Sequence, residues 1–296
     1  MNKQNIELNS SDDHALSLTV YTPRESIKGV LVLGHAMMTN SRSMDKPKGK
    51  GLASYLAEQG YLCYALDARG RGGSGAKAID GNDWSYDDLV LKDLPAVIGV
   101  VKSRHPDNKL FVLGHSLFGH GCLGMLGAKP ETPVDGVVCI AGNIWLPQLE
   151  KHYLKKLQKS IQLQIMDKLT RIFKRMPAKK IKFGNEDEAY TYSLGFLRWW
   201  KNNTWSTLDG EWDYLEGLSN VAQPVLAISG SGDNLMCTPE CSRRFMAYLG
   251  KSELTHYEAG KRASGLDYDP GHMDLVTNIK SKPVWGYIVT WLDSLL

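Results

Sequence analysis

No apolar run in the 296 residues approaches the roughly 18 residues that a membrane-spanning helix requires, and the first residues lack the apolar core of a secretory signal. Cysteine is scarce and odd in number, with five in the chain, and Cys63 and Cys139 lie in apolar runs. We therefore expect small buried core residues rather than disulfides, and a cytoplasmic protein.

Strong charge of one sign is also missing, because the net charge is only +3. That value does not support nucleic acid as a partner. The glycine-rich stretch 70–75 lacks both the Lys-Ser/Thr ending of a phosphate-binding loop and the spacing of a dinucleotide fingerprint. Cys237 and Cys241 have no further metal ligands near them in the sequence. We expect neither a metal nor a cofactor.

What the chain does have is a 43% hydrophobic content and an alternation of strand-like and helix-like segments. This alternation predicts an α/β fold with a mostly parallel sheet and helices on both faces. An antiparallel hairpin is expected over 5–22. The expected strands are 29–34, 61–66, 110–115, 135–141, 224–229 and 253–257, and the expected helices are 48–59, 86–104, 117–127, 238–249 and 283–294.

The most informative motif is Gly114-His115-Ser116-Leu117-Phe118-Gly119, which follows the apolar run 110–113. A buried parallel strand is expected before Ser116 and a helix after it. A serine on so tight a turn exposes its hydroxyl, next to backbone N–H groups that can receive a negative charge. Ser116 is therefore the candidate nucleophile, although a simple turn residue is the alternative.

Asp233 follows a second apolar run, 224–229, and His272 precedes the C-terminal helix, so the two are the candidate acid and base. A turn-forming aspartate and an incidental surface histidine are the alternatives. The other histidines and acids near these segments are less well placed as base or acid, namely His35, His115, His120, His256, Asp267, Asp269 and Asp274.

The order Ser116, Asp233, His272 is that of the α/β-hydrolase fold, and the chain resembles the capped lipase, esterase and serine-aminopeptidase-like branch of that superfamily, which includes monoacylglycerol lipases. The resemblance implies oxyanion-hole N–H groups from Met37 and Leu117. It also implies structural roles for the turn after strand 61–66. The hydrolase core then comprises 1–143 and 221–296, with a helical cap inserted at 144–220.

Phe118 departs from the family pattern, which has a small residue two positions after the nucleophile. We expect its ring to line the acyl pocket or to press against the cap. Trp199 and Trp200, in the aromatic second half of the cap, are further candidates for the pocket wall.

The stretch 151–182 carries eleven Lys and Arg against one acid, which leaves the rest of the chain at about −7. Leu154, Leu157, Ile161, Ile165, Leu169 and Ile172 recur there at helical spacing. One hypothesis is a cap helix whose apolar stripe packs on the core while its lysines are solvated. The other is a basic face that meets an anionic membrane or an acidic substrate, with nucleic acid as a third option.

Together these features predict a metal-independent serine hydrolase of carboxylic esters, with a small acyl ester as substrate. A thioesterase or an amide-cleaving relative would use the same triad. A hydrolase-fold protein that binds a ligand without turnover is the alternative that is not an enzyme. The oligomeric state is left open by the sequence.

Overall fold

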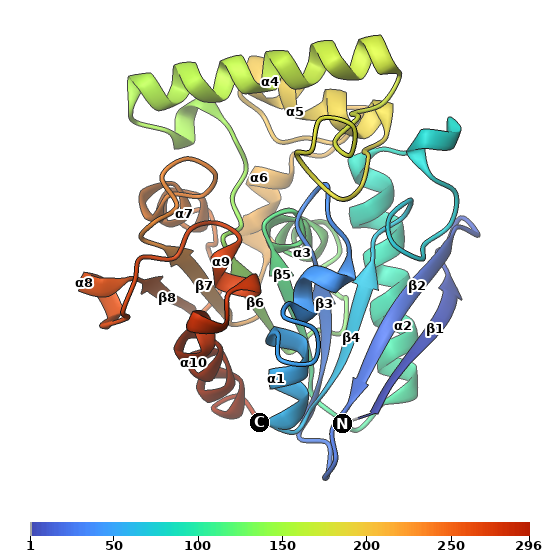
Figure 1. Cartoon of the computed structure of the whole chain (residues 1–296), viewed down its shortest axis with the longest axis vertical. Helices are drawn as coiled ribbons and strands as arrows, with labels where there is room; N and C mark the ends of the chain where they lie inside the picture. Colours follow the sequence, from blue (N-terminus) through green and yellow to red (C-terminus); the bar gives the residue numbers. More distant parts are fainter. Residues whose placement is uncertain (1) are drawn as a thin grey trace.

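The structure is a computed structural model that describes residues 2–296, and its centre is a single eight-stranded sheet in the order β1-β2-β4-β3-β5-β6-β7-β8 (Figure 1). Strand β2 is antiparallel to both of its neighbours, β1 and β4, and the six strands from β4 to β8 in that order pair in parallel. The strands are β1 (Asn2–Asn9), β2 (Ala15–Thr22), β3 (Gly29–Gly34), β4 (Tyr61–Asp67), β5 (Leu110–His115), β6 (Gly136–Ile140), β7 (Val225–Gly230) and β8 (Leu254–Ala259). The predicted mostly parallel sheet is confirmed.

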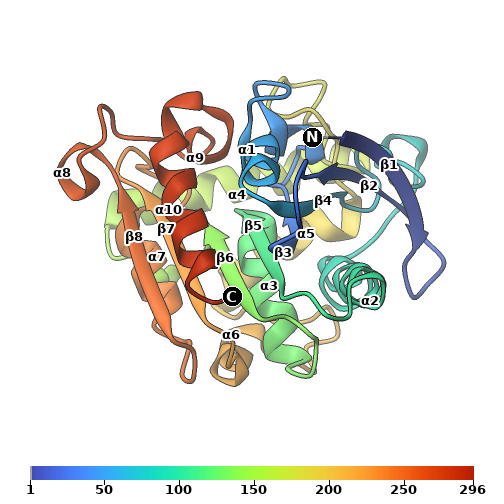
Figure 2. The same ribbon diagram turned by 90° about the horizontal axis from the view of Figure 1, so that it is seen from below.

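Helices cover both faces of the sheet, as Figure 2 shows from below. Along β3, Val30 and Val32 face one hydrophobic core, whereas Leu31 and Leu33 face the other. The first core is covered by α2 (Leu94–Arg104), α3 (Leu117–Ala128) and α7 (Pro239–Met246), and the second by α1 (Leu52–Glu58), α9 (Asp274–Thr277) and α10 (Lys282–Asp293). Short elements complete the fold: α8 (Lys261–Ser264) and 3-10 turns at Ser41–Asp45, Ala78–Asp80, Pro147–Leu149, Leu218–Asn220 and Ile279–Ser281.

The single helix expected over 86–104 is instead a π-helical turn, Asp88–Asp93, followed by α2. Pro95 explains the break, because it has no N–H to donate to the carbonyl of Leu91 four residues earlier. That carbonyl accepts a hydrogen bond from Lys129 Nζ at 2.9 Å instead. Helix α1 also begins later than expected, with Gly51 as its N-cap.

The segment between β6 and β7 adds no strand to the sheet and lies over the ends of the parallel strands (Figure 1). It contains α4 (Tyr153–Phe173), α5 (Tyr190–Asn202) and α6 (Tyr214–Gly217). Helices α4 and α5 pack against each other at the outer side of this layer. This is the segment in which the sequence predicts a cap, and we refer to residues 144–220 by that predicted name.

Helix α4 is oriented opposite to the simplest expectation, in which its apolar stripe packs on the core. Leu154 is 76% exposed and Ile172 is 66% exposed. The side chains that α4 buries are Lys159, Leu163, Met166 and Thr170. The spacing therefore predicted an apolar face correctly, but that face lies toward solvent.

All five cysteines are buried and free. Among the helices of residues 2–296, none has both the length and the apolar character needed to cross a bilayer.

Candidate active site

Ser116 occupies a sharp turn between β5 and α3. Its backbone has φ 54° and ψ −106°, in a positive-φ region that non-glycine residues seldom adopt, and its N–H donates to the Ile140 carbonyl at 2.9 Å. The glycines around it permit the close approach of helix and strand. A Cβ on Gly114 would lie 2.2 Å from the Phe118 carbonyl oxygen, and one on Gly119 would lie 2.9 Å from Cys139 Sγ. The sequence therefore folds locally into the turn that a nucleophilic serine needs.

Asp233 and His272 form a hydrogen-bonded pair, with His272 Nδ1 2.7 Å from Asp233 Oδ2. Asp233 lies after β7, where it also accepts from the N–H groups of Met236 at 2.8 Å and Cys237 at 2.9 Å. Burial alone would raise the pKa of Asp233. The hydrogen bond and charge of His272 outweigh this effect, together with the hydrogen bonds from backbone N–H groups, so that the pKa of Asp233 is lowered. Asp233 is thus held ionised where it can orient the imidazole.

The competing acids have other partners. Asp274 accepts from the Gly271 N–H at 3.0 Å, and Asp269 accepts from the Lys261 N–H at 2.8 Å. His115 is buried and its Nε2 lies 2.9 Å from the His272 carbonyl oxygen, so it supports the loop that carries the base. The structure therefore pairs His272 with the acid chosen from the sequence.

Two backbone N–H groups lie free near Ser116. Leu117 is the first residue of α3, and its N–H has no partner within the helix. The N–H of Met37 has no acceptor among residues 2–296. Both residues line the same cavity as Ser116, so this pair is placed to receive an oxyanion.

His35 fixes the start of the loop that carries Met37. Its Nε2 accepts from the Ala68 N–H at 3.1 Å, so Nδ1 carries the proton and donates to the Ala36 carbonyl at 2.8 Å. Complete burial, and then the charge of Arg71, lower the pKa of His35 to about 4. A neutral imidazole in one tautomer therefore ties the oxyanion loop to the turn after β4.

The far side of this loop is held by the cap. Met38 has φ 58°, and its N–H donates to the buried carboxylate of Glu188. Glu188 also pairs with Arg71, and both side chains are fully buried. The carbonyl of Met38 accepts from the Asn185 N–H at 2.8 Å. We name residues 184–188 the cap return segment, since they lie between α4 and α5 and contact the loop that carries Met38.

A neighbouring carboxylate of the return segment makes similar links. Glu186 Oε1 accepts from Asn40 Nδ2 at 2.7 Å and from the Gly72 N–H at 3.1 Å.

Asp67, the last residue of β4, stabilises the turn after this strand. Its carboxylate accepts from the N–H groups of Ser41 at 2.7 Å and Gly73 at 2.8 Å. Asp67 is therefore structural here, as the resemblance implies.

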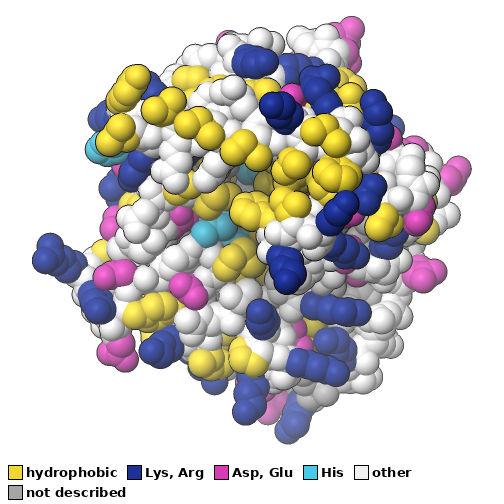
Figure 3. All heavy atoms as spheres, turned by 45° about the horizontal axis from the view of Figure 1, so that its top comes forward, with side chains coloured by type: hydrophobic (Ala, Val, Ile, Leu, Met, Phe, Trp, Pro, Cys, Tyr) yellow, Lys and Arg dark blue, Asp and Glu magenta, His cyan; other side chains and the backbone are white. Residues whose placement is uncertain are grey.

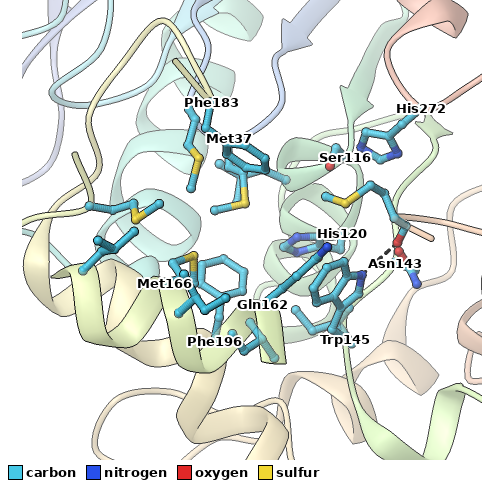
Figure 4. A pocket seen from close by; sticks show the side chains of 18 of the residues that line it. Met37, Ser116, His120, Asn143, Trp145, Gln162, Met166, Phe183, Phe196 and His272 are labelled. Atoms are coloured by element: carbon cyan, nitrogen blue, oxygen red, sulfur yellow. Dashed lines mark hydrogen bonds between the residues drawn. The ribbon is translucent and has the colours of Figure 1, made fainter. Parts of the chain in front are cut away.

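A cavity of about 220 Å³ opens beside Ser116 and His272, and Figure 4 shows both side chains at one end of it. Most of its wall is apolar and comes from the cap and the oxyanion loop. The polar side chains on the wall, besides Ser116 and His272, are His120, Asn143 and Gln162; the apolar ones are Met37, Met38, Leu117, Ile144, Trp145, Leu163, Ile165, Met166, Leu169, Met176, Ile181, Phe183, Phe196 and Met236. Asn143 Nδ2 is buried and unpartnered.

Three residues predicted to line the pocket do not do so. Phe118 is 1% exposed and packs over Gly34, where a Cβ would lie 2.1 Å from its ring, with the His35 ring 5.4 Å away. Trp199 is also buried, edge-on to Tyr86, and its Nε1–H donates to the Ser206 carbonyl at 2.7 Å. Trp200 is buried in the same core.

The large aromatic residues of the wall are instead Trp145, Phe183 and Phe196. Trp145 comes five residues after the end of β6, at the edge of the sheet where Ser116 also lies, so its position along the chain was a usable signal. The link between Arg71 and Glu188 joins residues that are 117 positions apart, and no local pattern indicates it. Among residues 2–296, no three His, Cys, Asp or Glu side chains gather as metal ligands.

Comparison with known proteins identifies the family and the fold of this chain. The family described as serine aminopeptidase, S33, matches residues 25–261. A monoacylglycerol lipase of Mycolicibacterium smegmatis is 33% identical over 110 residues, which are 37% of this chain and 36% of that lipase, so the match spans about a third of the relative's length.

Solved structures match over nearly the whole chain at low identity, and so show the fold. An esterase of Exiguobacterium antarcticum has a TM-score of 0.66 at 15% identity, covering 97% of this chain and 99% of that one. An esterase of Pyrococcus furiosus has a TM-score of 0.63 at 16% identity, and the match covers 99% of this chain and 91% of that one. A monoacylglycerol lipase of Paleococcus ferrophilus has a TM-score of 0.58 at 17% identity, and the match covers 100% of both chains. Since the family match spans most of the sequence, this chain belongs to the S33 serine aminopeptidase family of α/β hydrolases.

Proposed function

We propose that this protein hydrolyses carboxylic esters through an acyl-enzyme formed on Ser116. The observation that carries the proposal is the combination of a serine on a positive-φ turn with a hydrogen-bonded Asp233–His272 pair at the same end of an apolar cavity. A serine hydroxyl is a poor nucleophile at neutral pH and needs a neighbouring base.

In the first half-reaction His272 removes the Ser116 proton as the hydroxyl oxygen attacks the ester carbonyl carbon. The carbonyl oxygen becomes an oxyanion opposite the N–H groups of Met37 and Leu117, and each such donor typically contributes about 10²–10³ in rate. The ester C–O bond then breaks, and the alcohol leaves with the proton held by His272.

In the second half-reaction a water molecule replaces the alcohol. His272 takes a proton from the water as its oxygen attacks the acyl carbon, and the Ser116 oxygen leaves with that proton. The products are the carboxylic acid and the regenerated serine. Asp233 keeps the imidazole in one orientation and stabilises its cation through both halves.

The cavity wall supports an acyl chain of aliphatic character. Five methionines line it, and flexible thioether side chains adapt to different ligand shapes. Similarity to monoacylglycerol lipases supports an ester with one acyl chain and a small polar alcohol. In this proposal residues 144–220 act as the cap that shields the acyl-enzyme from bulk water.

The test is labelling with a fluorophosphonate, which reacts with an activated serine. The native chain should be labelled at Ser116, and Ser116→Ala should be unlabelled and should lose hydrolysis of p-nitrophenyl esters by a factor on the order of 10⁵–10⁶. Ser103→Ala, which changes an exposed serine, is the matched control and should behave as the native chain does. EDTA should have no effect on the rate.

The same assay separates the alternatives. Labelling without turnover of any ester in a graded chain-length series, combined with turnover of acyl thioesters or amides, would replace the ester by one of those substrates. A native chain that binds the esters but is neither labelled nor active would be a ligand-binding protein, and the proposal would be wrong.

A further inference from the structure

The outward face of α4 exposes a continuous line of large aliphatic side chains. The α4 apolar row consists of Leu154, Leu157, Ile161, Ile165 and Ile172, which are 76%, 47%, 47%, 54% and 66% exposed. Their spacing of three, four, four and seven residues places them on one side of the helix. Figure 3 shows hydrophobic side chains gathered over this part of the surface. Scattered exposed aliphatic residues are ordinary, but five of them aligned on one face of one helix are typical of a contact surface.

The row leads into the cavity of the proposed active site. Ile165 belongs both to the row and to the cavity wall. Ile181 and Phe183, on the loop after α4, are 42% and 67% exposed and line the cavity as well. An apolar path therefore runs from the outer surface of the cap to the space beside Ser116.

Positive charge surrounds the row. Five of the eleven Lys and Arg residues in 151–182 have a carboxylate partner, namely Lys151, Lys159, Arg171, Arg175 and Lys179. The other six have no ion-pair partner within residues 2–296: Lys155, Lys156, Lys168, Lys174, Lys180 and Lys182. The surface is thus an aliphatic strip with uncompensated cations around it, which complements anionic headgroups above an apolar interior.

We propose that the α4 apolar row docks on an anionic lipid surface, with the row inserted among the headgroups and the lysines in contact with lipid phosphates. Resting on the proposed function, this places the cavity mouth where an acyl ester can pass from the lipid into the enzyme without crossing water. A second copy of the chain fits this surface poorly, because pairing two rows would bring the six lysines without ion-pair partners in one copy close to the same six in the other.

The test is co-sedimentation of the full chain with vesicles of equimolar phosphatidylcholine and phosphatidylglycerol, compared with phosphatidylcholine alone. The native chain should bind the anionic vesicles, and binding should weaken between about 0.1 M and about 1 M salt. Leu154→Gln combined with Leu157→Gln and Ile161→Gln should weaken binding at least about 100-fold, since each aliphatic side chain removed from water contributes about tenfold. None of these three lines the cavity, so hydrolysis of a short soluble ester should not change.

The matched control replaces Ile79, Leu208 and Ile279 by Gln, because these aliphatic side chains are 55%, 52% and 38% exposed at separate places. It should bind as the native chain does. A charge variant with Lys168, Lys180 and Lys182 replaced by Glu should lose the preference for anionic lipid, at about fivefold per lysine removed.

Equal vesicle binding by the native chain and the Leu154, Leu157 and Ile161 variant, or no vesicle binding by either, overturns the proposal. So does a native dimer in sedimentation equilibrium that this variant converts to a monomer, because the row would then be an interface between copies. A native chain that binds vesicles but hydrolyses no soluble ester overturns the proposed function and leaves the docking surface intact.

Discussion

Replacing Glu188 by Gln tests whether the cap holds the oxyanion loop in its active geometry. The Glu188 carboxylate accepts from the N–H of Met38, next to Met37, the proposed oxyanion donor, and pairs with Arg71. The Glu188→Gln change replaces the carboxylate by a neutral amide in an ion pair whose two side chains, those of Glu188 and Arg71, are both fully buried. Breaking such a pair costs about 3–5 kcal/mol when the partner is left uncompensated, and the amide oxygen can serve either Arg71 or Met38 but not both well.

The expected effect of Glu188→Gln on kcat follows from the position of the Met37 N–H, which is adjacent in sequence to the Met38 N–H bound by Glu188. If the loop shifts and Met37 no longer faces the oxyanion, kcat should fall toward the roughly 10²–10³-fold loss of one donor. That donor acts mainly on the transition state, so KM for a short p-nitrophenyl ester should change much less than kcat. The measurement is steady-state kinetics together with a thermal denaturation curve for each variant.

Asp187→Asn is the matched control, because Asp187 lies in the same return segment and is also buried. Its carboxylate binds Arg175 at 2.8 Å and the Lys179 N–H at 2.9 Å, and it makes no bond to the oxyanion loop. We expect this variant to lose stability while keeping kcat. Equal losses of Tm with unchanged kcat in both variants would refute the reasoning and would leave Glu188 with a purely structural role.

Three further predictions concern the site and its surroundings. Ser116→Ala combined with His272→Ala should be scarcely slower than either change alone, because the two groups act as a unit; additive losses in kcat would contradict this. His115 and His120 are buried, which lowers the pKa of each to about 3, so the unfolded chain protonates first as pH falls from about 6.5. Chemical denaturation should show full stability above that pH and a loss of up to about 1.4 kcal/mol per pH unit for each histidine down to about pH 3; a flat profile would be inconsistent with neutral buried rings. Phe118→Gly should cost about 3–5 kcal/mol of stability without changing the preference for acyl chain length. A changed preference in a graded ester series would show that the Phe118 ring lines the pocket.

The sheet and the positions of the catalytic candidates were predictable because their signals are local. Short buried runs precede Ser116 and Asp233, and each expected parallel strand lies within one or two residues of the observed one. The carboxyl ends of parallel strands meet at one edge, so residues that follow those runs come together in space. The pairing of Asp233 with His272 in the structure is the geometric result of that rule.

The orientation of α4 could not be predicted from its own sequence. The helix has aliphatic residues on two sides, since Leu163 and Met166 are buried opposite the exposed row. Periodicity shows that a face exists, but the surface that covers it is made by other segments. Lys159 shows the same limit, because its burial depends on Glu150 at 2.9 Å and on the ring of Trp145.

The position of Phe118 depends on a partner distant in sequence. Its ring occupies the space above Gly34, at the end of β3, and this glycine lies more than eighty residues earlier. Phe118 can therefore occupy the turn only because residue 34 is a glycine. Neither residue alone shows on which side of the helix the ring lies.

The buried Lys159 also determines how the cavity-lining part of α4 is held. Its ammonium group bonds Glu150 at 2.9 Å and lies 3.7 Å from Cys241 Sγ on α7, so the first half of α4 is fastened to the hydrolase core. The mouth of the cavity lies farther along the helix, near Ile165. Beyond this anchor, α4 carries Leu163, Ile165, Met166 and Leu169, which line the cavity. The buried ammonium group therefore fixes the position of the cavity-lining side chains of α4 relative to the sheet.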